Sequence, residues 1–166
     1  MALPPPGTDR AAIVTGASSG IGEQFAGILS QRGYQVVLVA RSADRLEALA
    51  GRLGPHAHPL PADLSDRTAR AGLPDRVAAL GLTPDILINN AGFSTVGLVA
   101  KSVPEQELQL VEVDVAAVVD LCSRFLPGMV ERRRGAVLNV ASVAGFGPLP
   151  GQAAYGAAKA FVLSYT

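Results

Sequence analysis

The sequence has little of several residue types that mark specialised proteins. It contains one cysteine, Cys122, so no disulfide can form within the chain. We expect this residue to pack as a small hydrophobe in a helix. Trp is absent, and no cluster of Cys and His has the spacing of metal ligands. We therefore expect no metal site, and His56 and His58 are predicted to be ordinary surface residues.

The sequence also lacks a net charge and a long apolar run. Lys plus Arg equals Asp plus Glu, at 14 residues each, so no excess charge attracts nucleic acid or an anionic membrane. No apolar run approaches the ~18 residues of a membrane span. The proline-rich N-terminus has no apolar segment typical of a secretory signal. We expect no nucleic-acid partner, no membrane association and a cytoplasmic location.

What the sequence does contain is a regular alternation of apolar strand-like runs with helical patterns. Strands are predicted at residues 11–15, 35–40, 57–62, 85–89 and 135–141. Helices are predicted at residues 20–32, 43–53, 66–80, 104–132 and from 153 to the end. Continuously apolar strands separated by helices indicate an α/β fold with a doubly wound parallel sheet of the Rossmann type. We expect helices on both faces and the strand order 3-2-1-4-5.

The same pattern predicts the domain organisation. Residues 1–9 are expected to be a flexible tail, and residues 10–166 a single domain. The pattern ends inside a helix and leaves the fifth strand as a bare apolar edge, which natural sheets avoid. We expect from this that the domain lacks the last strands of its fold and is truncated at the C-terminal end. The alternative is a chain that ends in a frayed helix.

A glycine-rich segment, TGASSGIG, joins the first strand to the first helix. Glycine at positions 16, 20 and 22 would let a phosphate group approach the backbone, because no side chain blocks it. The N-terminal amides and dipole of the following helix favour an anion at that place. Ser18 and Ser19 can add hydroxyl donors. The segment therefore predicts a dinucleotide-binding turn; the alternative is an ordinary tight turn.

The end of the second strand indicates which dinucleotide is preferred. A site that selects NAD places an acidic residue there to bind the ribose 2′-hydroxyl. This sequence has Arg41 instead, and a guanidinium matches a 2′-phosphate in charge and geometry. We therefore expect NADP(H) to be preferred over NAD(H). The alternative is that Arg41 is only a solvated loop residue.

Three residues near the C-terminus form a candidate catalytic group. Tyr155 and Lys159 share a helix face because they are four positions apart. An unperturbed phenol titrates at about pH 10, and an adjacent ammonium stabilises its phenolate form. Ser142 follows the fifth strand at the sheet edge where open α/β folds bind ligands. Its hydroxyl could hold a substrate oxygen, although alone it would more often be a cap or turn residue.

Together, these motifs and the Asn89-Asn90-Ala91-Gly92 segment resemble the short-chain dehydrogenase/reductase family, in its shorter, non-extended branch. The resemblance implies an oxidoreductase that transfers a hydride between NADP(H) and a carbonyl or alcohol substrate. Tyr155 would be the general acid/base, Ser142 would hold the substrate oxygen, and Lys159 would assist Tyr155 and bind the nicotinamide ribose. The implied cofactor-binding residues are Gly16, Ser18, Ser19, Gly20, Ile21, Gly22, Arg41, Asp63, Leu64, Asn90, Ala91, Gly92, Tyr155 and Lys159.

One position departs from the family pattern. The family usually has an asparagine in the long helix that supports a water chain leading to the lysine, and the residue here is Asp114. A carboxylate could still bind the water, but it would place a negative charge near Lys159. We expect a reduced or acid-shifted proton relay in which Asp114 takes part. The alternative is that Asp114 faces solvent.

A second function stays open beside the enzyme. The chain could be a non-catalytic NADP(H)-binding protein, a truncated pseudoenzyme that acts through a partner. The intact Ser142, Tyr155 and Lys159 favour the enzyme, because a pseudoenzyme has no chemical reason to keep all three. The resemblance also implies a homo-oligomer that uses the helix over residues 104–132. The substrate class within carbonyl and alcohol compounds stays open.

Overall fold

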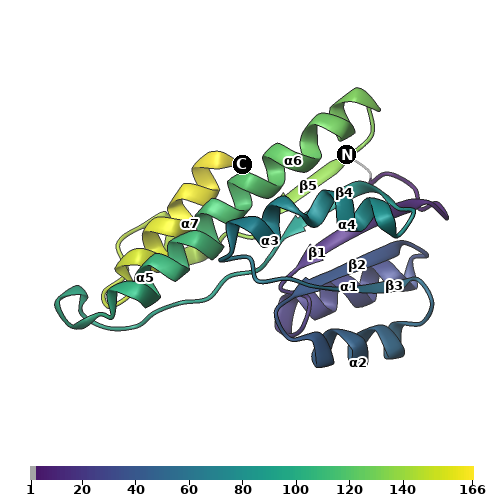
Figure 1. Ribbon diagram of the computed structural model, residues 1–166. Helices are drawn as coiled ribbons and strands as arrows, with labels where there is room; N and C mark the ends of the chain where they lie inside the picture. The colour runs from purple at the N-terminus through teal and green to yellow at the C-terminus, as the bar shows by residue number, and fades with distance from the viewer. Residues whose placement is uncertain (1–2) are drawn as a thin grey trace.

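The computed structural model describes residues 3–166 and contains one parallel sheet of five strands (Figure 1). The strands are β1 (Arg10–Thr15), β2 (Gln35–Ala40), β3 (Ala57–Pro61), β4 (Thr83–Asn89) and β5 (Ala136–Asn139). Their order is β3-β2-β1-β4-β5, which confirms the predicted topology. The order reverses between β1 and β4, and the carboxyl ends of these two strands border the place where such sheets bind ligands.

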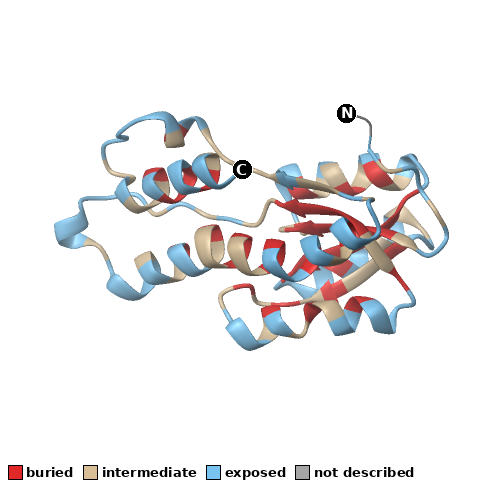
Figure 2. Cartoon of the chain, turned by 90° about the horizontal axis from the view of Figure 1, so that it is seen from above, coloured by how far each residue is buried: buried red, intermediate tan, exposed pale blue. Residues whose placement is uncertain are grey.

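Helices cover both faces of the sheet (Figures 1 and 2). They are α1 (Gly20–Gln31), α2 (Ala43–Leu53), α3 (Arg67–Ala71), α4 (Leu73–Ala79), α5 (Pro104–Val111), α6 (Ala117–Glu131) and α7 (Ala153–Tyr165). Short turns η1 (Val99–Lys101) and η3 (Val143–Phe146) are 3₁₀-helical, and η2 (Glu112–Ala116) is a π-helical turn between α5 and α6.

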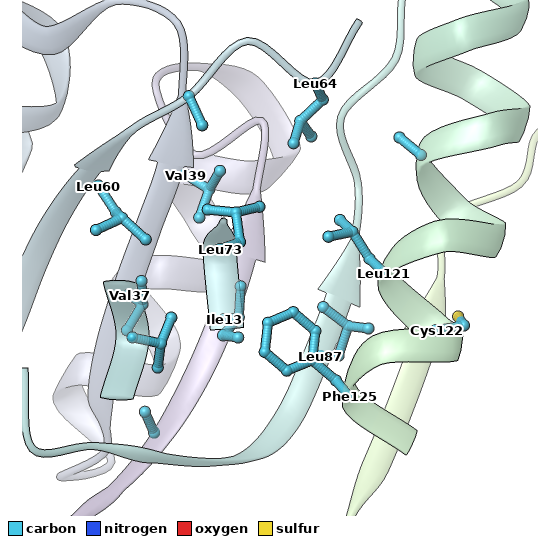
Figure 3. Packing of buried hydrophobic residues seen from close by; sticks show 14 of the residues in the cluster. Ile13, Val37, Val39, Leu60, Leu64, Leu73, Leu87, Leu121, Cys122 and Phe125 are labelled. Atoms are coloured by element: carbon cyan, nitrogen blue, oxygen red, sulfur yellow. The ribbon is translucent and has the colours of Figure 1, made fainter. Parts of the chain in front are cut away.

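Alternating side chains of the strands build two apolar layers. Ala12 and Val14 of β1 pack with buried residues of α1 and α2. Ile13 lies on the opposite face with buried residues of α4, α6 and α7. Figure 3 shows Leu121 and Phe125 of α6 pointing toward the sheet on this second face. The central residues of β1, β2 and β4 are apolar and buried because each of them meets a helix on one face or the other.

Three predicted elements differ from the structure. The helix predicted over residues 66–80 is wrong as a single helix, since α3 ends and α4 begins at Gly72. Pro74 lies in the first turn of α4, where its missing amide hydrogen costs nothing, whereas inside a continuous helix it would break a hydrogen bond. The fifth strand is shorter than predicted, covering 136–139. The long helix of residues 104–132 is interrupted by η2.

One edge of the sheet and the segment before β1 can be compared with the predictions. β3 is an edge strand, as its two prolines predicted. The carbonyl of Pro4 accepts a hydrogen bond of 2.7 Å from the Tyr34 hydroxyl, and that of Pro5 accepts one from Arg134. Flexibility of residues 1–9 stays a prediction, and residues 1–2 lie outside the described part. Within residues 3–166, no helix has both the length and the apolarity to cross a membrane.

Candidate active site

The glycine-rich turn between β1 and α1 has a geometry that only glycine satisfies. Gly16 and Gly20 have φ angles of +65° and +58°, in the left-handed region that disfavours other residues. A Cβ atom on Gly22 would lie 2.3 Å from the carbonyl oxygen of Gly16. A Cβ on Gly20 would meet no atom within 4 Å. The turn is therefore packed tightly on its inner side and open on the side of Gly20.

Thr15 holds this turn against the end of β4. Its buried hydroxyl donates to the carbonyl of Ile88 (3.2 Å) and accepts hydrogen bonds from the amides of Asn90 (2.9 Å) and Ala91 (3.0 Å). The Asn90 side-chain amide in turn donates to the carbonyl of Thr15 at 3.0 Å. Sequence reasoning did not identify Thr15 as a site residue, although a hydroxyl at the end of a central strand was the available signal. Asn90 thus joins the two central strands where the cleft begins.

A cleft of about 570 Å³ runs along this edge of the sheet, within the ~300–1,000 Å³ range of small-molecule sites. Of the predicted site residues, it is lined by Gly16, Ser18, Ser19, Ile21, Arg41, Asp63, Leu64, Asn90, Ala91, Gly92, Ser142, Tyr155 and Lys159. Gly20, Gly22 and Asp114 do not line it. Lining residues that sequence reasoning missed are Ala40, Ser42, Arg45, Ala62, Phe93, Ser94, Val113, Val140 and Ala141.

Two arginines stand at one end of this cleft. Arg41 follows β2, and Arg45 lies in the first turn of α2; both side chains are exposed and line the cleft. The sequence carried no signal for Arg45, because Arg41 precedes α2 and the two residues do not share a helix. Asp63 lies at the same end and accepts hydrogen bonds from the Ser65 amide (2.9 Å) and hydroxyl (2.8 Å). Burial alone would raise the pKa of Asp63, but these hydrogen bonds and the charge of Arg41 lower it.

Ser142, Tyr155 and Lys159 line the other part of the same cleft. The Ser142 hydroxyl accepts a hydrogen bond of 3.2 Å from the Ala144 amide and caps the turn η3. Because its oxygen is the acceptor, its own proton can be donated to another group. The ammonium of buried Lys159 lies 5.6 Å from the centre of the Tyr155 ring and donates to the carbonyl of Val140 at 3.2 Å.

Asp114 lies behind these residues, and the alternative that it faces solvent is wrong. It is fully buried in the π-helical turn η2, a distortion that often occurs at functional sites. Its Oδ1 accepts a hydrogen bond of 3.0 Å from the Phe93 amide, and its Oδ2 lies 3.1 Å from Nζ of Lys159. This ion pair has no aligned hydrogen bond at Oδ2. Burial raises the pKa of Asp114, although the charge of Lys159 and the Phe93 amide oppose the shift.

The contact between Asp114 and the end of β4 explains a further glycine. A Cβ atom on Gly92 would lie 2.6 Å from Oδ2 of Asp114. The carboxylate therefore occupies the space that a side chain at position 92 would need. The described residues, 3–166, contain no group of three or more His, Cys, Asp or Glu that could hold a metal ion.

Known proteins are similar to this chain over all five strands of the sheet and the residues that line the cleft. A family model for short chain dehydrogenases matches residues 10–166. The chain is 37% identical to nodulation protein G of Rhizobium sp. (strain N33), covering 96% of this chain and 65% of that protein. It is 35% identical to serine 3-dehydrogenase of Rhizobium radiobacter, covering 93% and 62%.

A solved structure gives the same relationship. The short-chain dehydrogenase from Sphingobium yanoikuyae, determined in complex with NADPH, is 38% identical with a TM-score of 0.87, covering 94% of this chain and 62% of that one. The chain thus spans less than two thirds of the length of each of these three relatives. Because the family model matches residues 10–166 and the chain has the parallel sheet and the glycine turn, the chain belongs to the short chain dehydrogenase family.

Proposed function

We propose that this chain is the cofactor-binding and catalytic part of an oxidoreductase that transfers a hydride between NADP(H) and a small carbonyl or alcohol compound. One observation carries the proposal: Ser142, Tyr155 and Lys159 line the same cleft as the glycine turn. A proton donor and a phosphate-binding turn therefore face one continuous space. The relationship to a dehydrogenase determined with NADPH supports the same reading.

The residues of the cleft fit a dinucleotide that carries a 2′-phosphate. The open side of Gly20 leaves room for a pyrophosphate at the N-terminus of α1. Ser19, the residue before α1, makes no capping hydrogen bond with its side chain, so its hydroxyl is available as a donor. Arg41 and Arg45 would bind the 2′-phosphate, because two guanidinium groups at one end of the cleft favour a dianion. When bound, NADP(H) supplies the hydride.

The chain's own residues would move the proton that accompanies the hydride. Ser142 would donate a hydrogen bond from its hydroxyl to the substrate oxygen and so hold that oxygen in place. Tyr155 would act as the general acid in reduction and as the general base in oxidation. Lys159 would stabilise the phenolate by its charge, while Asp114 would offset part of that charge through the 3.1 Å ion pair.

The ion pair also favours a second candidate function. If Asp114 neutralises Lys159 completely, the chain would bind NADP(H) without turning over a substrate, and would act through a partner. The surface of α5 and α6 would suit a second copy of the chain, since Leu108, Leu126 and Val130 are exposed there. Light scattering tests the homo-oligomer directly: a monomeric mass at micromolar concentration would contradict it.

Two experiments separate these functions. Calorimetric titration with NADPH and NADH is expected to show much tighter binding of NADPH, and the difference is expected to shrink in Arg41→Ala. A panel of ketones, aldehydes and acyl thioesters is then tested for oxidation of NADPH. Tyr155→Phe is expected to lower turnover by about 10²–10⁴-fold, the usual contribution of a general acid, while NADPH binding persists. Binding without any turnover would favour the non-catalytic function.

A further inference from the structure

Arg70 is a buried charge that the proposed chemistry does not use. It lies in α3 and is 3% exposed. Its guanidinium donates to three acceptors: the carbonyl of Leu64 (2.6 Å), Oε2 of Glu112 (3.0 Å) and Oδ2 of Asp120 (3.1 Å). A buried charge is tolerated only where such partners compensate its loss of hydration. The cation is thus fixed between three segments of the chain.

Two of these segments border the cleft. Leu64 follows β3 and itself lines the cleft beside Asp63. Glu112 is the first residue of the π-helical turn η2. The next residue, Val113, lines the cleft, and Asp114 then pairs with Lys159. Leu64 is beside Asp63, at the end of the cleft where Arg41 would bind the 2′-phosphate next to the adenine, and we call this the adenine end. A single side chain therefore connects the wall at the adenine end with the turn that carries Asp114.

The shape of the guanidinium makes this connection rigid. Its N–H groups form a planar fork whose directions are fixed relative to one another. The bonds to Leu64 and Glu112 leave from different nitrogens, Nη1 and Nη2, so the separation of these two segments is set by one planar group. The third bond, from Nε to Asp120, anchors the same plane to α6. A lysine could bind one of these acceptors but could not hold all three in this geometry.

The surrounding charges favour a fixed position for Arg70. Arg124 donates to the other oxygen of Asp120 at 2.6 Å, so two cations and two carboxylates form one network. Arg124 contacts only Asp120 among these residues and is about one third exposed. It offers a matched control, because its removal takes a cation from the same network without breaking the link between Leu64 and Glu112.

We propose that Arg70 is a positioning residue that sets the spacing between the adenine-end wall at Leu64 and the turn η2, and so couples cofactor binding to the Asp114–Lys159 pair. The proposal rests on the proposed function for its consequence in cofactor binding. The link itself is a property of the chain without ligand. Its loss should loosen both segments at once, although they are separated in sequence.

The first test uses the chain without cofactor. Amide hydrogen exchange is measured over residues 62–66 and 111–116 in the wild type, Arg70→Met and Arg124→Met. We expect exchange in both segments to accelerate by about tenfold or more in Arg70→Met, because local opening loses a shared buried anchor. Arg124→Met is expected to leave both segments near the wild-type rate. Acceleration confined to residues around position 70 would overturn the link.

The second test measures binding. Calorimetry with NADPH and with adenosine 2′,5′-bisphosphate, which carries only the adenine end, is expected to show affinities about tenfold weaker in Arg70→Met and partly restored in Arg70→Lys, as expected for a fork replaced by a single ammonium. A merely structural role would lower the melting temperature without changing either affinity. Unchanged affinities in a folded Arg70→Met would therefore refute the proposal.

A third variant covers the case in which Arg70→Met does not fold. Glu112→Gln keeps the Leu64 contact and removes the charge at the start of η2. We expect faster exchange over residues 111–116, a shifted pH profile of turnover and unchanged affinity for the adenine fragment. If Glu112→Gln leaves both the exchange and the profile unchanged, Arg70 does not position η2. If the wild type binds no NADPH, the proposed function fails, whereas the exchange experiment still decides the link.

Discussion

The ammonium of Lys159 lies 3.1 Å from Oδ2 of Asp114, and their side chains are 7% and 0% exposed. The pair is thus removed from water immediately behind Tyr155. A carboxylate in this position opposes the effect of the Lys159 charge on the Tyr155 phenol. Burial raises the pKa of Asp114, and the charge of Lys159 and the Phe93 amide offset this rise only in part.

Replacing Asp114 by Asn should therefore raise turnover. The variant keeps an acceptor for the Phe93 amide but removes the negative charge beside Lys159. We expect turnover at neutral pH to rise by about 2- to 10-fold and the pH–rate profile to shift, since one opposing charge near the acid/base pair is lost. The measurement is kcat with a carbonyl substrate across pH. Glu131→Gln, on the exposed end of α6, is the control; identical profiles for wild type and Asp114→Asn would refute the idea.

The same residue has an effect on stability with a defined sign. Because the folded chain holds a proton at Asp114 more readily than the unfolded chain, this group's contribution to stability is lost as pH rises through the folded-state pKa. The Asp114→Asn variant has no carboxyl group at this position, so it does not lose this stability as pH rises. The difference in melting temperature between the variant and the wild type should accordingly increase with pH in thermal scans. A constant difference across the titration range would contradict the raised pKa.

The glycine turn offers a matched pair of substitutions on one helix. Gly22→Ala places a Cβ 2.3 Å from the Gly16 carbonyl oxygen, whereas Gly27→Ala meets no atom within 4 Å. We expect Gly22→Ala to lower the free energy of unfolding by about 1–3 kcal/mol through overpacking and to abolish detectable NADPH binding. Gly27→Ala should gain about 0.5–1 kcal/mol as a helix-interior substitution. Chemical denaturation and calorimetry test both; equal effects of the two would be unexpected.

Cys122 should be unreactive in the folded chain. It is 1% exposed, as the sequence predicted, and burial raises the pKa of its thiol, although its hydrogen bonds with Asn89 and Asn139 act in the opposite direction. Because the thiolate is the reactive form, we expect native labelling by a disulfide reagent to be at least ~100-fold slower than labelling in denaturant. Cys122→Ser supplies the blank. Rapid labelling of the native chain would show that α6 opens easily.

His58 on the edge strand β3 should make the folded chain less stable in mild acid. His58 is half-buried and shares Gln35 with His56, through Gln35 contacts of 2.8 Å and 3.0 Å. Burial, and then the charge of His56, lower the pKa of His58. Its contribution to stability is therefore lost as pH falls from about 6.5, the unfolded-state value, through the lower folded-state value. Denaturation between about pH 7 and pH 5.5 should show a smaller decrease for His58→Gln than for the wild type.

The sequence predicted those elements whose signals are local. The strand over residues 35–40 and the helix over residues 43–53 match β2 and α2, since a continuous apolar run and a leucine stripe specify them. The break at Gly72 was not predicted, although Pro74 supplied its physical cause. The π-helical turn η2 leaves no mark in the apolar pattern. It is associated with the contacts of Asp114 to Phe93 and Lys159, which only the folded chain brings together.

The candidate site shows the same division. Residues of the glycine turn and of the helix that carries Tyr155 could be predicted because their motifs, taken together, resemble those of a known family. Arg45 and Val113 reach the cleft only because the sheet places their segments beside it. Arg70 resembles a surface residue in a polar helix, and its burial depends on acceptors as distant as Asp120. His58 was predicted as a surface residue and is half-buried, because Gln35 lies beside it on β2.

The Thr15 hydroxyl, which binds residues at the end of β4, has a consequence for how the chain folds. Its bond to Ile88 spans 73 positions in sequence, and loops of this length close slowly relative to neighbouring turns. The first strand, turn and helix leave the ribosome well before β4 does, yet Asn90 and Ala91, which follow β4, lie against the inner side of the glycine turn. Competence to bind a nucleotide should therefore arise late in folding, and a nascent chain that ends before residue 90 should bind none.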